Sequence, residues 1–101
     1  MEKQKIKPRR TIVSCLSTVR LGQRIRLSFD SIREQWILLG PEKVIVLDEI
    51  AHNIVNRCDG STNIEEIISQ LSTEYDASVA DIQQDVLSLL QNLVDKRFLQ
   101  L

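Results

Sequence analysis

The chain has 101 residues, 43% of them hydrophobic, which predicts a single globular domain with a small core. Its two cysteines, Cys15 and Cys58, are too few and too far apart for a secreted disulfide scaffold. The net charge of −1 favours no particular partner, and the N-terminus lacks the sustained apolar stretch of a signal peptide or membrane span. We therefore expect a cytoplasmic protein with free thiols and no membrane partner.

Charge is unevenly distributed along the chain. Residues 1–26 hold eight of the 13 basic residues and one acid, whereas residues 27–101 hold the other 13 acids. We interpret residues 1–19 as a flexible basic extension and residues 20–101 as the folded domain. A phosphate-binding or membrane-binding arm is the alternative interpretation of the extension.

Three short strands are predicted after the extension. The stretch "RIRLSFD" (24–30) alternates apolar and polar residues, as a half-buried strand does. "QWILLG" (35–40) and "VIVL" (44–47) are apolar runs separated by the turn-forming "PEK" (41–43). Short connections between all three predict an antiparallel meander.

The pattern then changes to a helical period of 3.6 residues. Asp48 is suited to cap a first helix, and Gly60, in a left-handed conformation, to end it. Thr62 and Glu65 stand in the T-x-x-E spacing of a capping box, which predicts the start of a second helix. The chain is thus an α+β domain, a three-stranded antiparallel sheet followed by three helices.

The third helix, expected over about 79–96 after a cap at Ser78, has an apolar face wider than a core-facing helix needs. It either packs centrally on the sheet and both other helices, or lines a groove open to a partner. We expect one side of this face to form the core and the other to be partly exposed. The core side comprises Ile82, Val86, Leu89 and Leu93, and the groove side Leu87, Leu90 and Val94.

The third strand is an outer strand of the meander, and only Lys43 and Asp48 flank it as charged guards. An unprotected edge beside an apolar helix is the arrangement used to bind a peptide as an added strand. The predicted peptide-binding residues are Lys43, Val44, Ile45, Val46, Leu47, Val86, Leu87, Leu90 and Val94.

Residues for catalysis are scarce. His52 is the only histidine, and we expect it on the exposed side of the first helix or partly in the core. No Cys/His cluster, nucleophile motif or glycine-rich phosphate loop is present, so we expect no enzyme activity, no metal and no cofactor. A DNA-binding winged-helix regulator is the alternative, but the acidic third helix disfavours specific nucleic-acid binding.

The segment "LLGPEKVIVLDEIAHNIVNRCDGSTNIEEI" (38–67) resembles the PqqD family of pyrroloquinoline quinone (PQQ) biosynthesis, and the resemblance extends over about residues 20–101. The residues that carry it are Pro41, Glu42, Leu47, Glu49, Ala51, Ile54, Asp59, Gly60, Thr62, Glu65 and Ile67. Residues 1–19 have no counterpart in the short members, Asp48 stands where asparagine is common, and "KRFLQL" (96–101) lacks the usual glycine.

This resemblance implies a winged helix-turn-helix domain of the RiPP-recognition-element type. Such a domain is a peptide chaperone. It holds the leader of a ribosomally made precursor, here a PqqA-like peptide, as an added strand and presents it to a radical-SAM enzyme like PqqE. Carried over to this sequence, the leader would run along residues 43–47 and rest against the third helix.

Overall fold

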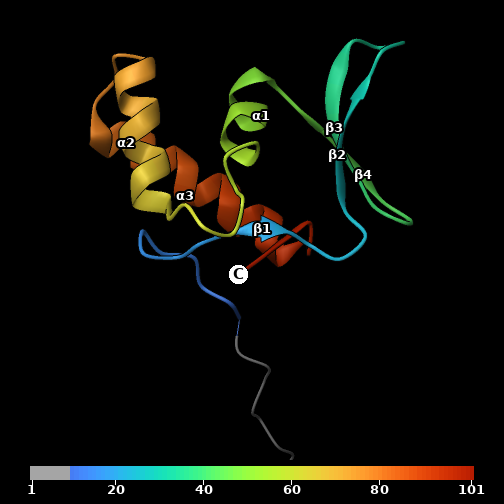
Figure 1. Cartoon of the computed structure of the whole chain (residues 1–101), viewed down its shortest axis with the longest axis horizontal. Coiled ribbons are helices and arrows are strands. Elements are labelled where there is room, and N and C mark those ends of the chain that lie inside the picture. The colour runs from blue at the N-terminus through green and yellow to red at the C-terminus, as the bar shows by residue number, and fades with distance from the viewer. Residues whose placement is uncertain (1–9) are drawn as a thin grey trace, which may run out of the picture.

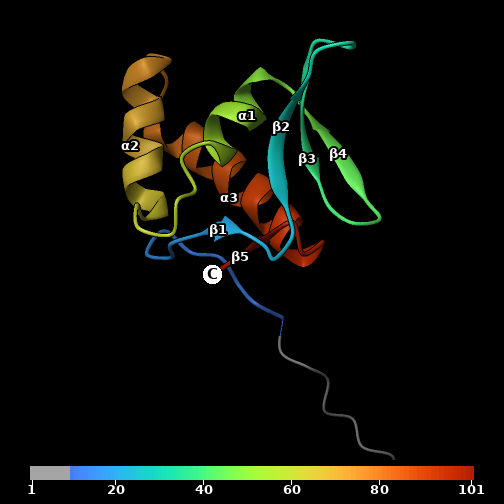
Figure 2. The same cartoon turned by 45° about the vertical axis from the view of Figure 1, so that its right-hand side comes forward.

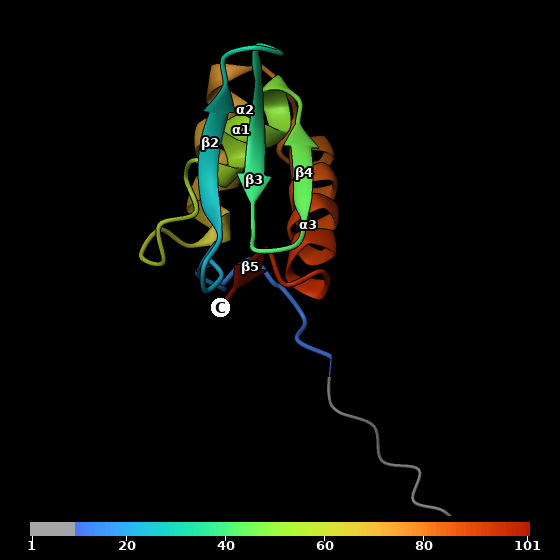
Figure 3. The same ribbon diagram turned by 90° about the vertical axis from the view of Figure 1, so that its right-hand side faces the viewer.

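The computed structural model describes residues 10–101 and contains a sheet and three helices (Figure 1). The sheet has the order β2-β3-β4, formed by β2 (Arg26–Asp30), β3 (Gln35–Leu39) and β4 (Val44–Leu47), and both pairings are antiparallel. The helices α1 (Glu49–Val55), α2 (Ile64–Glu74) and α3 (Val79–Asp95) follow in sequence. They lie behind one face of the sheet, and the opposite face is open in Figure 3. The predicted meander and helix order are confirmed.

A second, two-stranded sheet was not predicted. It pairs β1 (Arg20–Leu21) with β5 (Leu99–Gln100) and joins the two ends of the domain beneath the helices (Figure 2). The backbone N–H of Gly22 donates to the carbonyl of Phe98 (2.9 Å) and extends this contact. Because Arg24 takes a positive φ of 63°, β2 begins at Arg26 and not at residue 24 as expected.

The predicted caps are confirmed for α1 and α3 and wrong for α2. The Asp48 carboxylate accepts from the Ala51 N–H (2.7 Å), and the Ser78 hydroxyl accepts from the N–H of Asp81 (3.2 Å). At α2 the capping box uses Asn63 and Glu66, each side chain accepting from the other residue's backbone N–H.

Asp59 explains why the α2 cap is displaced by one residue. Its carboxylate accepts from the N–H groups of Ser61 and Thr62 (2.8 Å each) and from the Thr62 hydroxyl (3.2 Å). Thr62 is therefore held in the turn and is not free to cap the helix. Gly60 has the expected positive φ (81°), although α1 already ends at Val55.

Residues 10–19 pack on the domain, so the boundary expected at residues 19 and 20 is wrong for this part of the chain. Val13 and Val19 are buried in the core. The carbonyls of Ser17 and Cys15 accept from the N–H groups of Ile64 and Glu65 at the start of α2 (3.0 and 2.9 Å). These bonds satisfy helix N–H groups that have no partner within the helix. Residues 1–9 of the expected extension lie outside the described residues.

The core is mainly aliphatic, as the composition predicts, and lies between the three helices and the inner face of the sheet. Its completely or nearly buried side chains include Val19, Leu38, Ile64, Ile67, Leu71, Val86, Leu90, Leu93 and Leu99. None of the helices in the described part of the chain has the length and apolar character needed to span a bilayer.

Candidate functional site

The open side of β4 presents free backbone hydrogen-bonding groups. Among the described residues β4 pairs only with β3. The N–H of Gly40 donates to the carbonyl of Lys43 (2.8 Å), which makes these residues a hydrogen-bonded pair. Hydrogen-bonded and non-hydrogen-bonded pairs alternate in an antiparallel ladder. The register therefore directs the N–H and C=O groups of Val44 and Val46 away from β3, where another strand can pair with them.

The side chains of β4 alternate between the two faces of the sheet. Leu47 is buried and Ile45 half-buried on the inner face, so they fix the strand against the helices. Val44 and Val46 are each 54% exposed on the outer face. Ile45 and Leu47 thus anchor the strand to the helices, whereas Val44 and Val46 carry the backbone groups that point away from β3.

Lys43 is held away from the open edge. Its ammonium group donates to the carbonyl of Lys96 at the end of α3 (2.6 Å) and lies 4.7 Å from the centre of the Phe98 ring. A cation at a helix C-terminus is favoured by the helix dipole. Lys43 therefore links the start of β4 to the end of α3 and does not guard the edge as a free charge.

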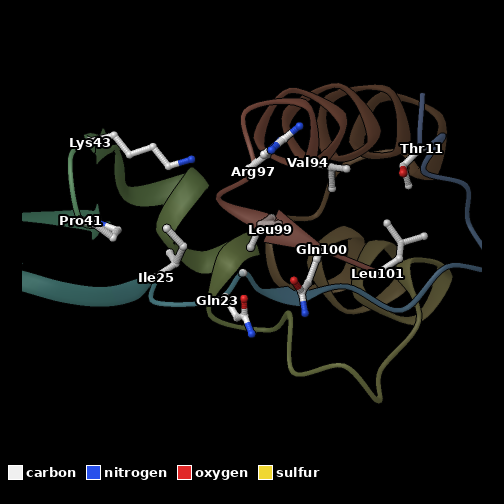
Figure 4. Close-up of a pocket in the computed structure, with 11 residues that line it drawn as sticks. Thr11, Gln23, Ile25, Pro41, Lys43, Val94, Arg97, Leu99, Gln100 and Leu101 are labelled. Carbon is white, nitrogen blue, oxygen red and sulfur yellow. The ribbon is translucent and has the colours of Figure 1, made fainter. Parts of the chain in front are cut away.

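A cavity of about 580 Å³ lies below this link, between the β3–β4 turn, the β1–β5 sheet and the end of α3 (Figure 4). Lys43 and Arg97 lie on one side of it, and Ile25 and Leu99 lie near its centre. The cavity adjoins the start of β4, and its lining mixes apolar and cationic side chains.

The two flanks of α3 differ in what covers them. Gln91 accepts from the Val13 N–H (2.9 Å) and donates to the Thr11 carbonyl (2.8 Å), so residues 11–13 cover its flank. Leu87 lies one turn from Gln91, displaced by only about 40° around the axis, and therefore belongs to the same flank. Leu89 lies about 200° from Leu87 and faces the opposite way.

The expected division of α3 into core and groove is therefore wrong in part. Leu90 is completely buried (0% exposed) and Val94 is buried, although both were assigned to an open groove. Val86 and Leu93 are buried as expected, but Ile82 and Leu89, also assigned to the core, are only half-buried. The reason is that α3 is packed by α2, α1, β5 and residues 11–13 together, which moves the centre of the buried arc to Val86, Leu90 and Leu93.

The partial exposure of Ile82 and Leu89 is not expected from the sequence. The signal that could have placed them is Asp85, which lies next to both on the helical wheel and marks the margin of the apolar arc. Ile82 and Leu89 are seven positions apart and therefore share one flank of α3. Ile82 lines a cavity together with Ile50 and Ile54 of α1, so this flank is the one next to α1.

Aromatic contacts hold α1 against the sheet. The Trp36 ring of β3 stacks on the His52 imidazole of α1, with ring centres 4.0 Å apart and planes 9° apart. Phe29 of β2 meets Trp36 edge-on at 5.1 Å. His52 thus lies partly in the core, one of the two expected placements, and helps to fix the end of β4 through α1.

Neither cysteine forms a disulfide. The Cys58 thiol is buried and donates to the Ile54 carbonyl (3.4 Å). Burial, with a smaller effect of the Asp59 carboxylate, raises the pKa of this thiol to about 12. Since the thiolate is the nucleophilic form, Cys58 is suited to packing and not to chemistry.

The model of the family described as "Coenzyme PQQ synthesis protein D (PqqD)" matches residues 35–99, which include β4 and all three helices. The chain belongs to the PqqD family. It is similar to the PqqA binding protein of Rhodopseudomonas palustris (strain TIE-1), with 45% identity over 92 residues that cover 91% of this chain and 90% of that protein. It is also similar to the PqqA binding protein of Xanthomonas oryzae pv. oryzae (strain PXO99A), with 46% identity over 77 residues, 76% of this chain and 84% of that protein.

Two solved structures of the PqqD family share the fold. One is the solution NMR structure of the PqqD truncation of Methylobacterium extorquens PqqCD, described as a functional, stand-alone RiPP recognition element. It has a TM-score of 0.77 and 35% identity, covering 90% of this chain and 97% of that one. The other is the crystal structure of PqqD from Xanthomonas campestris, with a TM-score of 0.57 and 41% identity, covering 80% and 90% of the two chains.

Proposed function

We propose that this chain is a non-catalytic peptide chaperone of PQQ biosynthesis that binds the leader of a PqqA-like precursor as an added strand on β4. The observation that carries the proposal is the free edge of β4, where the backbone groups of Val44 and Val46 have no strand partner among the described residues. Relatives that are 45% and 46% identical are named PqqA binding proteins, which supports the choice of peptide.

The groove residues follow from the placement of α3. A strand added to β4 would lie beside the flank of α3 that carries Leu89 and Ile82. We therefore propose the backbone of residues 43–47 and these two side chains as the contact surface. Of the α3 residues predicted from the sequence to bind the peptide, Val86, Leu90 and Val94 are buried and Leu87 lies on the far flank, so we leave them out of the contact surface.

The leader would be held in the cytoplasm for a second protein to modify. The resemblance of this chain to the PqqD family implies a radical-SAM enzyme like PqqE in that role, and we propose this partner. It is tested by sedimentation of purified PqqE with the chain, with and without PqqA. Co-sedimentation that depends on the chain supports the assignment, and separate boundaries in both mixtures contradict it.

A backbone substitution tests the binding mode. Val46→Pro removes an N–H that points to the open side, so it should leave the β3–β4 ladder intact but weaken PqqA binding about tenfold, the value of roughly one hydrogen bond of 1.4 kcal/mol. Val46→Ala is the matched control, because it shortens the same side chain and keeps the N–H. Calorimetric titration of both variants with a synthetic PqqA peptide gives the comparison.

Amide chemical shifts locate the peptide independently. On addition of PqqA, shifts should concentrate at residues 43–47 and near residues 82–89. Equal affinities of Val46→Pro and Val46→Ala, or shifts confined to α2, would contradict the proposed strand addition. Thermal melts of both variants confirm that each is folded.

A further inference from the structure

An apolar cavity lies where the proposed groove passes the start of α1. It is a cavity of about 230 Å³ enclosed by α1, the end of α2 and the start of α3. Ile50 and Ile54 of α1 form one wall and Ile82 of α3 the other, while Tyr75 and Ala77 close it from the end of α2 and the turn that follows. Asp85 is the only charged residue in the lining.

The size and chemistry of this cavity suit an aliphatic side chain. An apolar cavity of about 150 Å³ in a protein remains dry and takes up benzene. This cavity is larger and is lined almost entirely by carbon. Ile50 and Tyr75 are 54% and 39% exposed, so the cavity opens to the surface and is not a closed packing void.

Its position connects it to the β4 edge. Ile50 follows Leu47, the last residue of β4, by three positions, and Asp48 and Glu49 make the connection. Ile82 and Asp85 belong to the same flank of α3 as Leu89, which we place in the groove. An extended peptide advances about 3.3 Å per residue. A leader that pairs with β4 and continues past Leu47 therefore reaches the mouth of the cavity within a few residues.

We propose that this cavity is an anchor subsite for one aliphatic side chain of the bound peptide, outside the stretch that pairs with β4. The inference rests on the proposed peptide-binding function and adds a side-chain determinant to backbone pairing. Backbone pairing alone is tolerant of sequence, and side-chain pockets supply the specificity of strand addition. The carboxylate of Asp85 at the cavity disfavours an acidic residue next to the anchor.

Filling the cavity from within tests the proposal. Ala77→Leu adds a branched side chain to the lining, at a position whose backbone is fixed by bonds to Ser72 (2.6 and 3.1 Å). Ala80→Leu is the matched control, because Ala80 is exposed and does not line the cavity. We expect Ala77→Leu to weaken PqqA binding on the order of 10- to 100-fold, the effect of losing one fully buried aliphatic side chain, and Ala80→Leu to bind as the unaltered chain does.

Peptide variants and methyl labels identify the occupant. Each aliphatic residue of PqqA is replaced by alanine in turn, and one replacement should weaken binding to the unaltered chain but not to Ala77→Leu. Nuclear Overhauser contacts from labelled methyl groups of Ile50, Ile54 and Ile82 should reach the same peptide residue.

The outcomes separate this inference from the proposed function. If PqqA does not bind the unaltered chain, the proposed function fails. If PqqA binds and Val46→Pro weakens it, but Ala77→Leu binds with unchanged affinity and no contacts reach the three isoleucine methyl groups, the function stands and the anchor subsite is refuted. Should Ala77→Leu fail to melt cooperatively, the methyl contacts on the unaltered chain decide the question.

Discussion

Replacing Leu90 with alanine tests which side of α3 forms the core. Leu90 is completely buried, so its truncation loses the transfer free energy of the removed carbons and leaves a cavity. We expect a loss of about 3–5 kcal/mol in the free energy of unfolding. At 3 kcal/mol the melting temperature of a domain of this size falls by about 12–24 °C. Because the total stability of such a domain is about 5–15 kcal/mol, the variant should be severely destabilised.

Leu89→Ala is the matched control, since it removes the same atoms from the next position on the helix. Leu89 is half-buried, and its truncation opens to the surface, at the proposed groove, without forming a closed cavity. Half of the transfer free energy of three methylene groups is about 1.2 kcal/mol. Urea melts give both free energies, and titration with PqqA below the melting range gives both affinities. The reasoning is refuted if Leu89→Ala is as destabilising as Leu90→Ala and leaves PqqA affinity unchanged.

Three further predictions concern the scaffold around the site. Asn63→Ala should lower the free energy of unfolding by about 1 kcal/mol, because Asn63 caps α2, and Thr62→Ala should lower it less; urea melts in which Thr62→Ala has the larger effect would restore the cap expected from the sequence. Cys58, with a thiol pKa raised to about 12, should react with a thiol reagent at pH 8 more slowly than the half-buried Cys15, as peptide mapping would show, and equal rates would contradict the buried placement. Hydrogen bonds from the backbone N–H groups of Thr62 and Ser61 lower the pKa of Asp59. Its contribution to stability is therefore present above the unfolded pKa of about 3.9 and is lost as the pH falls through the lower folded value. Asp59→Asn should remove this part of the acid sensitivity, and an unchanged dependence of the free energy of unfolding on pH would contradict it.

Elements with a strong local signal could be predicted from the sequence. The alternation in β2, the apolar runs of β3 and β4 and the two short turns specify an antiparallel meander. Ser78 and Asp48 begin their helices because each has a free side-chain oxygen at the required spacing. The edge of β4, which has no strand partner among residues 10–101, is also predictable, since the last strand of a meander has a neighbour on one side only.

Local patterns are less informative where two groups compete. The T-x-x-E spacing at Thr62 and Glu65 is a valid capping signal. In the structure, however, the Thr62 hydroxyl donates to Asp59, and Asn63 caps the helix. The distinction depends on the conformation of the turn around Gly60, which spacing alone does not reveal.

The tertiary structure alone decided which carbons of α3 are available to a ligand. A helical wheel shows the width of an apolar arc but not which neighbour covers each part of it. Residues 11–13 reach Gln91 across 78 or more positions of sequence and cover the flank that carries Leu87. The pairing of β1 with β5 joins residues 20–21 to residues 99–100 in the same way. Such contacts form because the folded core brings distant segments together. In addition, a strand of two residues has too little intrinsic preference for β structure to be recognised from its own sequence.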